Sequence, residues 1–162
     1  MAAKSMILAF VILCLIGVWG ARNSDMTKNL LQPRGVRNNN PLNIRIGNND
    51  WQGKASTSND DEFETFTHSK YGFRAGAKIL QNYQTQYGLY TLAEMINRFA
   101  PPNENNTKNY AAFVAGEIGV DVNQRVDMQD RHLLARTVHA MSIMEVGRHY
   151  TINDAIEGVA LV

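Results

Sequence analysis

Residues 130–146 read DRHLLARTVHAMSIMEV, a helical segment whose apolar residues point in almost every direction. Those apolar residues are Leu133, Leu134, Val138, Met141, Ile143, Met144 and Val146. A helix that is apolar around most of its circumference is stable in water only when other elements cover it. We therefore predict that residues 130–146 form the buried central helix of a small domain.

The segment before this helix shows three further helical patterns. Apolar residues recur every three or four positions from Ser69 onward and end at Gly88, a residue typical of helix C-termini. Thr91-Leu-Ala-Glu94 is a capping box, and it predicts a helix that stops before Pro101. A third helix is expected to start with Thr107 as its cap and to end at Gly119.

The two ends of the domain complete the pattern. After the central helix, Thr151-Ile-Asn-Asp154 predicts a cap for a short last helix. Before the first helix, Trp51, Gly53, Phe63 and Phe66 indicate a short, twisted β region with loops. A small β region followed by four or five helices is the order of a lysozyme-like α+β fold, mainly helical, with a cleft between two lobes.

The N-terminus has a different character. Lys4 precedes an uninterrupted apolar run, residues 6–20, which spans about 22 Å as a helix, less than the roughly 30 Å of a bilayer core. Ala2, Ala3 and Ala21 extend the run enough for a transmembrane signal anchor, whereas Val18 and Gly20 permit a cleaved signal peptide. We expect an anchor or signal at 1–21, a linker at 22–33 and the folded domain at 34–162, facing the exterior.

Composition excludes several classes of function. The net charge is only +1, so the chain has no excess of basic residues that would indicate nucleic-acid binding. The single cysteine, Cys14, lies in the apolar run, which rules out an intrachain disulfide and a Cys-His nucleophile in the domain. The four histidines are scattered and show no metal-binding spacing, and no glycine-rich phosphate loop is present, so we expect no metal and no cofactor.

Several motifs together resemble a family of bacteriophage virion proteins that are described as structural proteins or as peptidoglycan-degrading enzymes. The motifs cover about residues 34–120: RGVRNNNPLNIR at 34–45, WQG at 51–53, FETF at 63–66, YGFRAG at 71–76 and FAPPNENNT at 99–107. The Asn-Asn-Pro-Leu-Asn-Ile-Arg run is also similar to β-N-acetylglucosaminidases of lysozyme-like fold. The spacing of Glu104, Tyr110 and Val114 is similar to an element of soluble lytic transglycosylases.

These resemblances imply cleavage of peptidoglycan glycan strands, with one departure. The glucosaminidases carry their acid glutamate on a helix upstream of the Asn run, whereas residues 21–37 hold Asp25 as their only acid. Either the proton donor lies elsewhere in this chain or the catalytic chemistry is missing.

Glycosidic cleavage needs a carboxyl group that is still protonated near neutral pH, and in most enzymes a second carboxylate. Glu104, in a proline-flanked loop near aromatic residues, is the first candidate, although a role as a helix N-terminal carboxylate is the alternative. Glu62 and Glu64 flank Phe63 in the β region, where a second carboxylate is expected. The alternative for these two is an exposed acidic loop.

Sugar binding needs flat aromatic faces and amide groups. The residues of the right type that we expect to contact the glycan are Trp51, Asn39, Asn40, Asn43, Tyr71 and Tyr110. The alternative is that the tyrosines pack in the core and the asparagines shape turns.

The sequence therefore predicts a phage peptidoglycan glycosidase of the lytic transglycosylase, muramidase or glucosaminidase type. It would be held at the virion membrane or the host inner membrane, or secreted if the signal is cleaved, with peptidoglycan strands, the membrane and other virion proteins as partners. The alternative from another class is a non-catalytic virion structural protein with a glycan-binding lysozyme-like domain. An exported bacterial autolysin is a third possibility.

Overall fold

The computed structural model describes residues 31–58, 60–100 and 106–162, and within them the chain is mainly helical. Its helices are α2 (Arg34–Arg37), α3 (Ser69–Tyr87), α4 (Leu92–Phe99), α5 (Thr107–Ile118), α6 (Arg131–Val146) and α7 (Ile152–Val159). Residues Arg34–Val162 make up one compact unit. The described helices include none that is long and apolar enough to cross a membrane, and the predicted anchor or signal at 1–21 lies outside the described residues.

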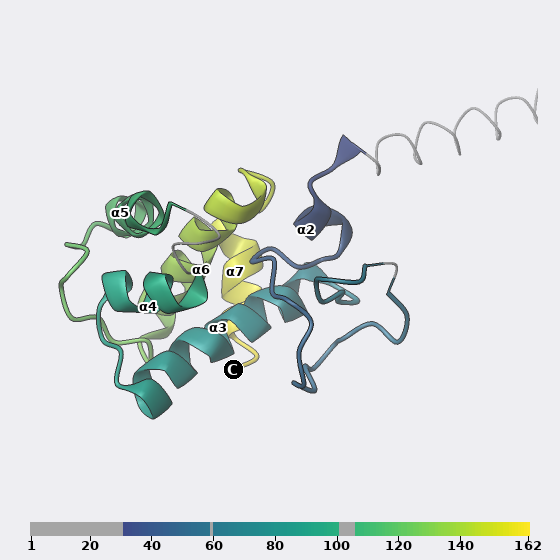
Figure 1. The fold of residues 1–162 in the computed structure, drawn as a ribbon, viewed down its shortest axis with the longest axis horizontal. Coiled ribbons are helices and arrows are strands. Elements are labelled where there is room, and N and C mark those ends of the chain that lie inside the picture. The colour runs from purple at the N-terminus through teal and green to yellow at the C-terminus, as the bar shows by residue number, and fades with distance from the viewer. Residues whose placement is uncertain (1–30, 59, 101–105) are drawn as a thin grey trace, which may run out of the picture. The chain divides into compact units, whose positions relative to one another are not determined.

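Helix α3 is the axis of this unit, running diagonally through Figure 1 with loops on one side and helices on the other. It begins after His68, whose side chain accepts a hydrogen bond from the Lys70 N–H, and it ends at Gly88 with φ 66°. The left-handed conformation at Gly88 carries almost no steric cost for glycine, which explains why the helix stops where the sequence predicts.

Two glycines on one face of α3 let a loop lie directly against the helix. A Cβ atom at Gly72 would come within 2.5 Å of the Asn39 carbonyl oxygen, and one at Gly76 within 2.6 Å of the Leu42 side chain. The glycines of the YGFRAG motif are thus needed for close packing of residues 39–42 on α3.

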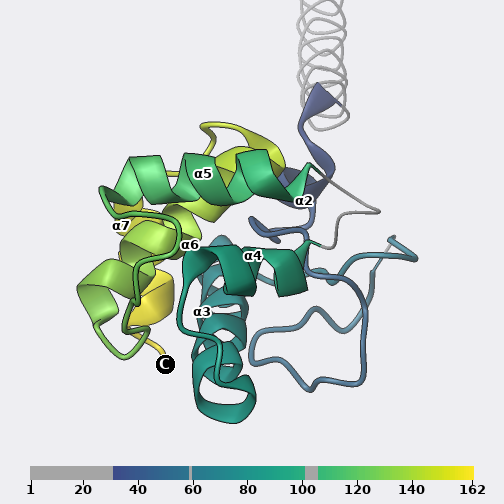
Figure 2. The same cartoon turned by 60° about the vertical axis from the view of Figure 1, so that its left-hand side comes forward.

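Helices α4 and α5 lie above α3 in Figure 2 and pack against each other. The capping box predicted for α4 is present, since the Thr91 side chain accepts from the Glu94 N–H and the Glu94 carboxylate accepts from the Thr91 N–H. The predicted cap of α5 is shifted by one residue. Asn106 is the N-cap, while Thr107 is the first helical residue and donates its hydroxyl hydrogen to the Ala100 carbonyl at 2.7 Å.

Helix α6 is central, as predicted, because α2, α3, α5 and α7 all pack against it. Asp130 caps its N-terminus by accepting hydrogen bonds from two backbone N–H groups, and Leu134, Val138 and Met141 are fully buried. One side nevertheless faces solvent, since Met144 is 41% exposed. The apolar pattern alone did not show this exposed side.

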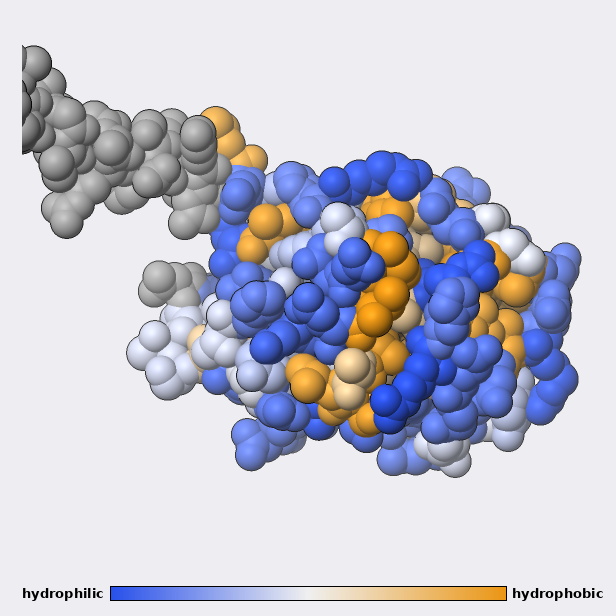
Figure 3. All heavy atoms as spheres, turned by 180° about the vertical axis from the view of Figure 1, so that it is seen from behind, coloured by the Kyte–Doolittle hydropathy of each residue, from blue (hydrophilic) through white to orange (hydrophobic). Residues whose placement is uncertain are grey.

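Helix α7 closes the unit against α3 and α6 and is capped by Thr151 and Asp154, as the sequence predicts. Its close approach to α3 requires Gly158, where a Cβ atom would lie 2.4 Å from the Phe73 Cβ. Ile152 and Ile156 on the outer side of α7 remain exposed. The molecule seen from behind shows a stripe of apolar residues bordered by hydrophilic ones (Figure 3).

The predicted β region is reduced to isolated bridges. Arg45 pairs with Phe63 and Lys54 with Phe66, both antiparallel, and no longer strand forms among the described residues. Side-chain hydrogen bonds connect these segments in place of strand pairing, since the Asn40 amide donates to the carbonyls of Ile44 and Glu64 at 2.9 Å each. The Arg34 guanidinium joins α2 to the same region through Asp60.

Candidate active site

A cleft lies between the loop segment 42–51 and the helical part of the unit. It consists of two cavities that share four wall residues, Ile44, Arg45, Ile79 and Tyr83. We call the cavity that also contains Glu145 the inner cleft, with a volume of about 390 Å³. The other, which we call the outer cleft, has a volume of about 550 Å³ and is also lined by Trp51, Tyr87 and Arg98.

Glu145 is placed at the inner cleft by the last turn of α6. The surrounding wall is mostly apolar and comes from three other parts of the chain: residues 42–45 with Phe63, the middle of α3, and the end of α4 at Phe99 and Ala100. Among the described residues that line the two cavities, Glu145 is the one acidic side chain.

Two side chains hold the Glu145 carboxylate. The Asn43 amide donates to its Oε2 at 3.0 Å, and the same amide reaches the Glu145 backbone carbonyl at 3.3 Å. The Tyr110 hydroxyl, on α5, donates to the Met141 carbonyl at 3.5 Å and also lies within reach of the Glu145 carboxylate, whose pKa it lowers. The carboxyl group is thus fixed in orientation from two elements distant in sequence.

Burial raises the pKa of Glu145 above its ordinary value, because the charged form loses contact with water. The hydrogen bonds from Asn43 and Tyr110 act in the opposite direction and lower the pKa, but burial is the larger effect. Burial also raises the pKa of Tyr110 well above its usual range, so the phenol stays a proton donor in the hydrogen bond. A carboxyl group with a raised pKa in an apolar cleft can act as a general acid near neutral pH.

The loop that carries Asn43 has an unusual backbone. Asn39 and Asn43 have positive φ angles of 50° and 46°, a left-handed conformation that asparagine tolerates better than most residues. Gly35 of α2 supports this turn at close range, since a Cβ atom there would lie 2.4 Å from the Asn43 side-chain oxygen. The NNNPLN run therefore shapes the turn that brings Asn43 onto Glu145.

The carboxylates predicted from sequence lie elsewhere. Glu62 is exposed and bonds Arg34 at 2.6 Å, and Glu64 is 1% exposed and bonds the Lys54 ammonium at 2.9 Å. Neither lines the inner or the outer cleft. Glu104 falls outside the described residues, between Ala100 of the inner cleft and Asn106 at the cap of α5.

Of the residues predicted to bind sugar, the structure brings two to Glu145 and one to the outer cleft. Asn43 and Tyr110 contact the Glu145 carboxylate, and Trp51 lines the outer cleft. Asn39 and Asn40 already donate to protein carbonyls, those of Phe66 for Asn39 and of Ile44 and Glu64 for Asn40. The Tyr71 ring packs on the backbone of Gly53, where even a Cβ atom would come within 2.1 Å of the ring.

Glu145 itself was missed by the sequence reasoning, which treated residues 130–146 as a core helix. One signal could have found it, because it is the only acid within that helix after Asp130. A carboxylate on the buried helix of a small domain needs a partner or a function.

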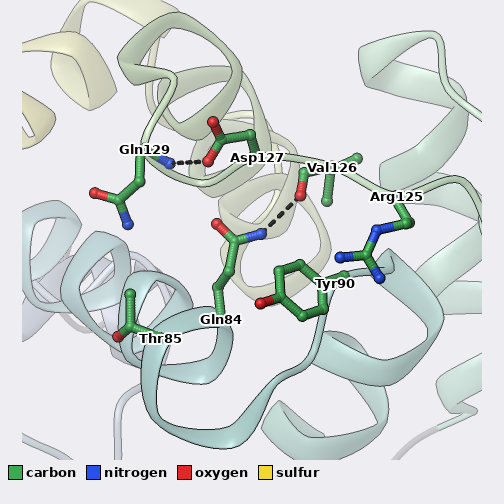
Figure 4. Close-up of a pocket in the computed structure, with 7 residues that line it drawn as sticks. All are labelled: Gln84, Thr85, Tyr90, Arg125, Val126, Asp127 and Gln129. Carbon is green, nitrogen blue, oxygen red and sulfur yellow. Dashed lines mark hydrogen bonds between the residues drawn. The ribbon is translucent and has the colours of Figure 1, made fainter.

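Two further cavities lie away from Glu145. One is shown in Figure 4, where the Arg125 guanidinium lies over the Tyr90 ring and the Gln84 amide donates to the Val126 carbonyl at 2.7 Å. The other lies between α4 and α5 and has largely apolar walls. Within the described part of the chain, no group of three or more His, Cys, Asp or Glu side chains is arranged to hold a metal ion.

No protein-family model matches the chain. Protein P5 of Pseudoalteromonas phage PM2 is 40% identical over 129 residues, which span 77% of this chain and 79% of that protein.

The chain belongs to the family of phage protein P5. This agrees with the resemblance to bacteriophage proteins found in the sequence. The similarity extends over 77% of the chain, so the P5 family shares more than a short motif with it.

Proposed function

We propose that this member of the P5 family is a virion- or membrane-associated enzyme that cuts the glycan strands of peptidoglycan, with Glu145 as the proton donor. The observation that carries the proposal is the Glu145 carboxyl group, half-buried at the inner cleft with a raised pKa, bonded by Asn43 and close to Tyr110. Leaving-group protonation at a glycosidic bond requires such a group. The bridged loop region facing a helical lobe across the cleft also fits a lysozyme-like architecture.

The cleft suits a sugar chain in shape and in composition. The inner and outer clefts share four wall residues, so a sugar chain that occupies one would extend toward the other. Phe63, Tyr83 and Phe99 line the inner part, and Trp51 and Tyr87 line the outer part, providing flat apolar surfaces for sugar rings.

Glu145 is the one carboxyl group that the described residues place in the cleft, and this favours a mechanism in which a substituent of the sugar assists the departure of the leaving group. Glu145 would protonate the glycosidic oxygen, and the cleaved sugar would be stabilised by its own neighbouring group. Glu104 is the candidate for a second carboxylate, because it follows Ala100, a wall residue of the inner cleft, by four positions in the sequence. Glu62 and Glu64 remain weaker candidates, since each is paired with a basic side chain outside the cleft.

The test is digestion of purified peptidoglycan by the full-length protein, with the soluble muropeptides separated and identified by mass spectrometry. Glu145→Gln should lower the rate roughly 10²–10⁴-fold, because the amide keeps the shape but cannot donate the proton. Glu117→Gln is the matched control, since Glu117 lies on the surface of α5 in an ion pair with Arg148. Glu104→Gln, Glu62→Gln and Glu64→Gln examine the other predicted carboxylates in the same assay.

The products then separate the possible functions. Full activity of Glu145→Gln together with loss in Glu104→Gln would move the proton donor to Glu104. If the wild-type protein releases no muropeptide but binds peptidoglycan, the non-catalytic structural role is correct instead.

A further inference from the structure

We infer that the outer cleft is a binding site for a carboxylate group of the substrate, so that the preferred ligand is an acidic glycan rather than a neutral one. This inference rests on the proposed function, because it assigns a substrate class to the same cleft. The proposed carboxylate site is the outer cleft, which is lined by Arg45 and Arg98 but not by Glu145.

The charge of the outer cleft is one-sided. Two of its ten wall residues are arginines and none is acidic. The remaining polar wall residues are neutral amides, those of Asn49, Asn82 and Gln86. Because the whole chain has a net charge of only +1, this local excess of positive charge does not follow from composition.

Aromatic rings hold the two guanidinium groups in place. The Arg98 guanidinium lies 3.7 Å above the centre of the Tyr87 ring and 5.4 Å from that of Tyr83. The Arg45 guanidinium lies 5.0 Å from the centre of the Phe63 ring. For Arg98, stacking on the Tyr87 ring leaves the edge of the guanidinium, with its N–H donors, available to a ligand.

Arg98 is also exposed, and among the described residues no carboxylate pairs with it. Other arginines of the unit show the contrast. Arg34 bonds Asp60 and Glu62, and Arg148 bonds Glu117. A planar guanidinium over an aromatic ring, at the wall of a cavity, is suited to bind a carboxylate through two parallel hydrogen bonds.

The chemistry of the proposed substrate supplies such groups. A sugar chain of peptidoglycan carries acidic substituents on alternate units, whereas a chain of N-acetylglucosamine alone is neutral. A sugar chain that runs from the inner to the outer cleft would place an acidic substituent beside Arg98 while the bond to be cut lies at Glu145. The outer cleft would thus fix the register of the chain relative to the proton donor.

The experiment measures binding by titration calorimetry with full-length Glu145→Gln protein, so that the ligand is not consumed. The two probes are soluble peptidoglycan fragments with free carboxylates and an N-acetylglucosamine oligomer of the same number of sugars. Arg98→Gln should weaken binding of the acidic fragment about tenfold, in line with loss of a charge-assisted hydrogen-bond pair, and change binding of the neutral oligomer less than about twofold. Added salt should weaken binding of the acidic fragment only.

Arg125→Gln provides the matched control. Arg125 lies over the Tyr90 ring at 3.8 Å, nearly the same arrangement as Arg98 on Tyr87, but in the cavity of Figure 4 away from Glu145. It should leave the binding of both probes unchanged. Arg98→Lys should retain part of the preference for the acidic fragment, because the charge remains while the paired geometry is lost.

The inference is overturned if Arg98→Gln weakens both probes equally, if it weakens neither, or if the wild-type cleft binds no acidic fragment. The proposed function has a separate criterion, the loss of muropeptide release in Glu145→Gln. A protein that never cleaves peptidoglycan but prefers the acidic fragment through Arg98 would refute the enzyme and retain the acidic-ligand site.

Discussion

At the scale of single residues, the described part of the cleft has one carboxyl group, that of Glu145, and two neighbouring side chains that influence it, Asn43 and Tyr110. Burial raises the pKa of Glu145, and the hydrogen bonds from Asn43 and Tyr110 partly oppose that rise. In the proposed enzyme the two neighbours would be positioning residues, since they would act on the substrate only through the carboxyl group. Their removal should therefore move a pH profile, which a purely structural residue would not do.

Tyr110→Phe removes one hydrogen bond to the Glu145 carboxylate while the ring stays in its buried place. The charged form loses a stabilising donor, so the pKa of Glu145 should rise further. Because the active form is the protonated one, activity falls as pH rises through this pKa, and the alkaline limb should move to higher pH. The measurement is the rate of muropeptide release across pH, and an unmoved limb with a lower maximum would contradict the assigned role. Tyr150→Phe, at a half-buried tyrosine that does not line the cleft, is the control.

At the scale of elements, hydrogen bonds of the Asp60 side chain connect α2 to residues 60–63. Its side chain is 7% exposed and accepts bonds from the Arg34 guanidinium, the Asn38 amide and the backbone N–H groups of Glu62 and Phe63. The hydrogen bonds from Arg34 are the largest cause that holds the pKa of Asp60 well below its usual range. A carboxylate of depressed pKa stabilises the fold above its unfolded-state pKa, and this stability is lost as pH falls below about 4.

Asp60→Asn should lower the free energy of unfolding at neutral pH by about 2 kcal/mol or more, because the guanidinium loses a charged partner in a nearly buried setting. The deficit relative to wild type should shrink as pH falls below about 4, because the Asp60 carboxylate of the unfolded wild-type chain then binds a proton while that of the folded chain is still charged. Denaturant unfolding at several pH values measures this. Asp61→Asn is the control, since the Asp61 side chain is 96% exposed and should change stability by less than about 0.5 kcal/mol. A constant deficit at all pH values would show that Asp60 acts through shape alone.

The close packing of α7 on α3 predicts opposite effects on stability for two glycine substitutions. Gly158→Ala should destabilise the unit by about 1–3 kcal/mol, because the new methyl group meets the Phe73 Cβ at 2.4 Å and the Lys70 carbonyl at 2.8 Å. Gly116→Ala, also within a helix, has open space around it and should stabilise by about 0.5–1 kcal/mol through helix propensity. Urea denaturation of both variants tests the opposite signs, and a stabilised Gly158→Ala would show that α7 can shift away from α3.

At the scale of the whole molecule, the N-terminal apolar run is expected to hold the protein at a membrane. The full-length protein should sediment with membranes and be released by detergent. Ile12→Arg should weaken this attachment, because a charge at the centre of an apolar span costs about 2.5–3.5 kcal/mol. A mature N-terminus near Ala21 would favour the signal peptide instead, and a soluble full-length protein that starts at Met1 would refute both.

The sequence by itself determined where most of the helices begin and end, although the cap of α5 is Asn106 and not the predicted Thr107. Gly88, the Thr91–Glu94 box, Gly119, Asp130 and the Thr151 cap all act within one helical turn, so their effect is independent of the rest of the fold. The central place of α6 also followed from its own apolar pattern. The reduced β region did not, because side-chain bonds from Asn40 and Asp60 replace the strand pairing that the aromatic residues suggested.

Only the tertiary structure decided which glutamate faces the cleft. Glu145 and Asn43 are separated by 102 positions, and their contact requires the left-handed turn at Asn43, the close packing at Gly35 and the arrival of α5 with Tyr110. A pKa is raised by the loss of water around a group, and this depends on every element that covers it. Glu62 and Glu64 had the more suggestive neighbours in sequence, but their partners in space are Arg34 and Lys54. Local sequence signals therefore determine most helix ends, whereas burial by segments distant in sequence determines which glutamate has a raised pKa at the cleft.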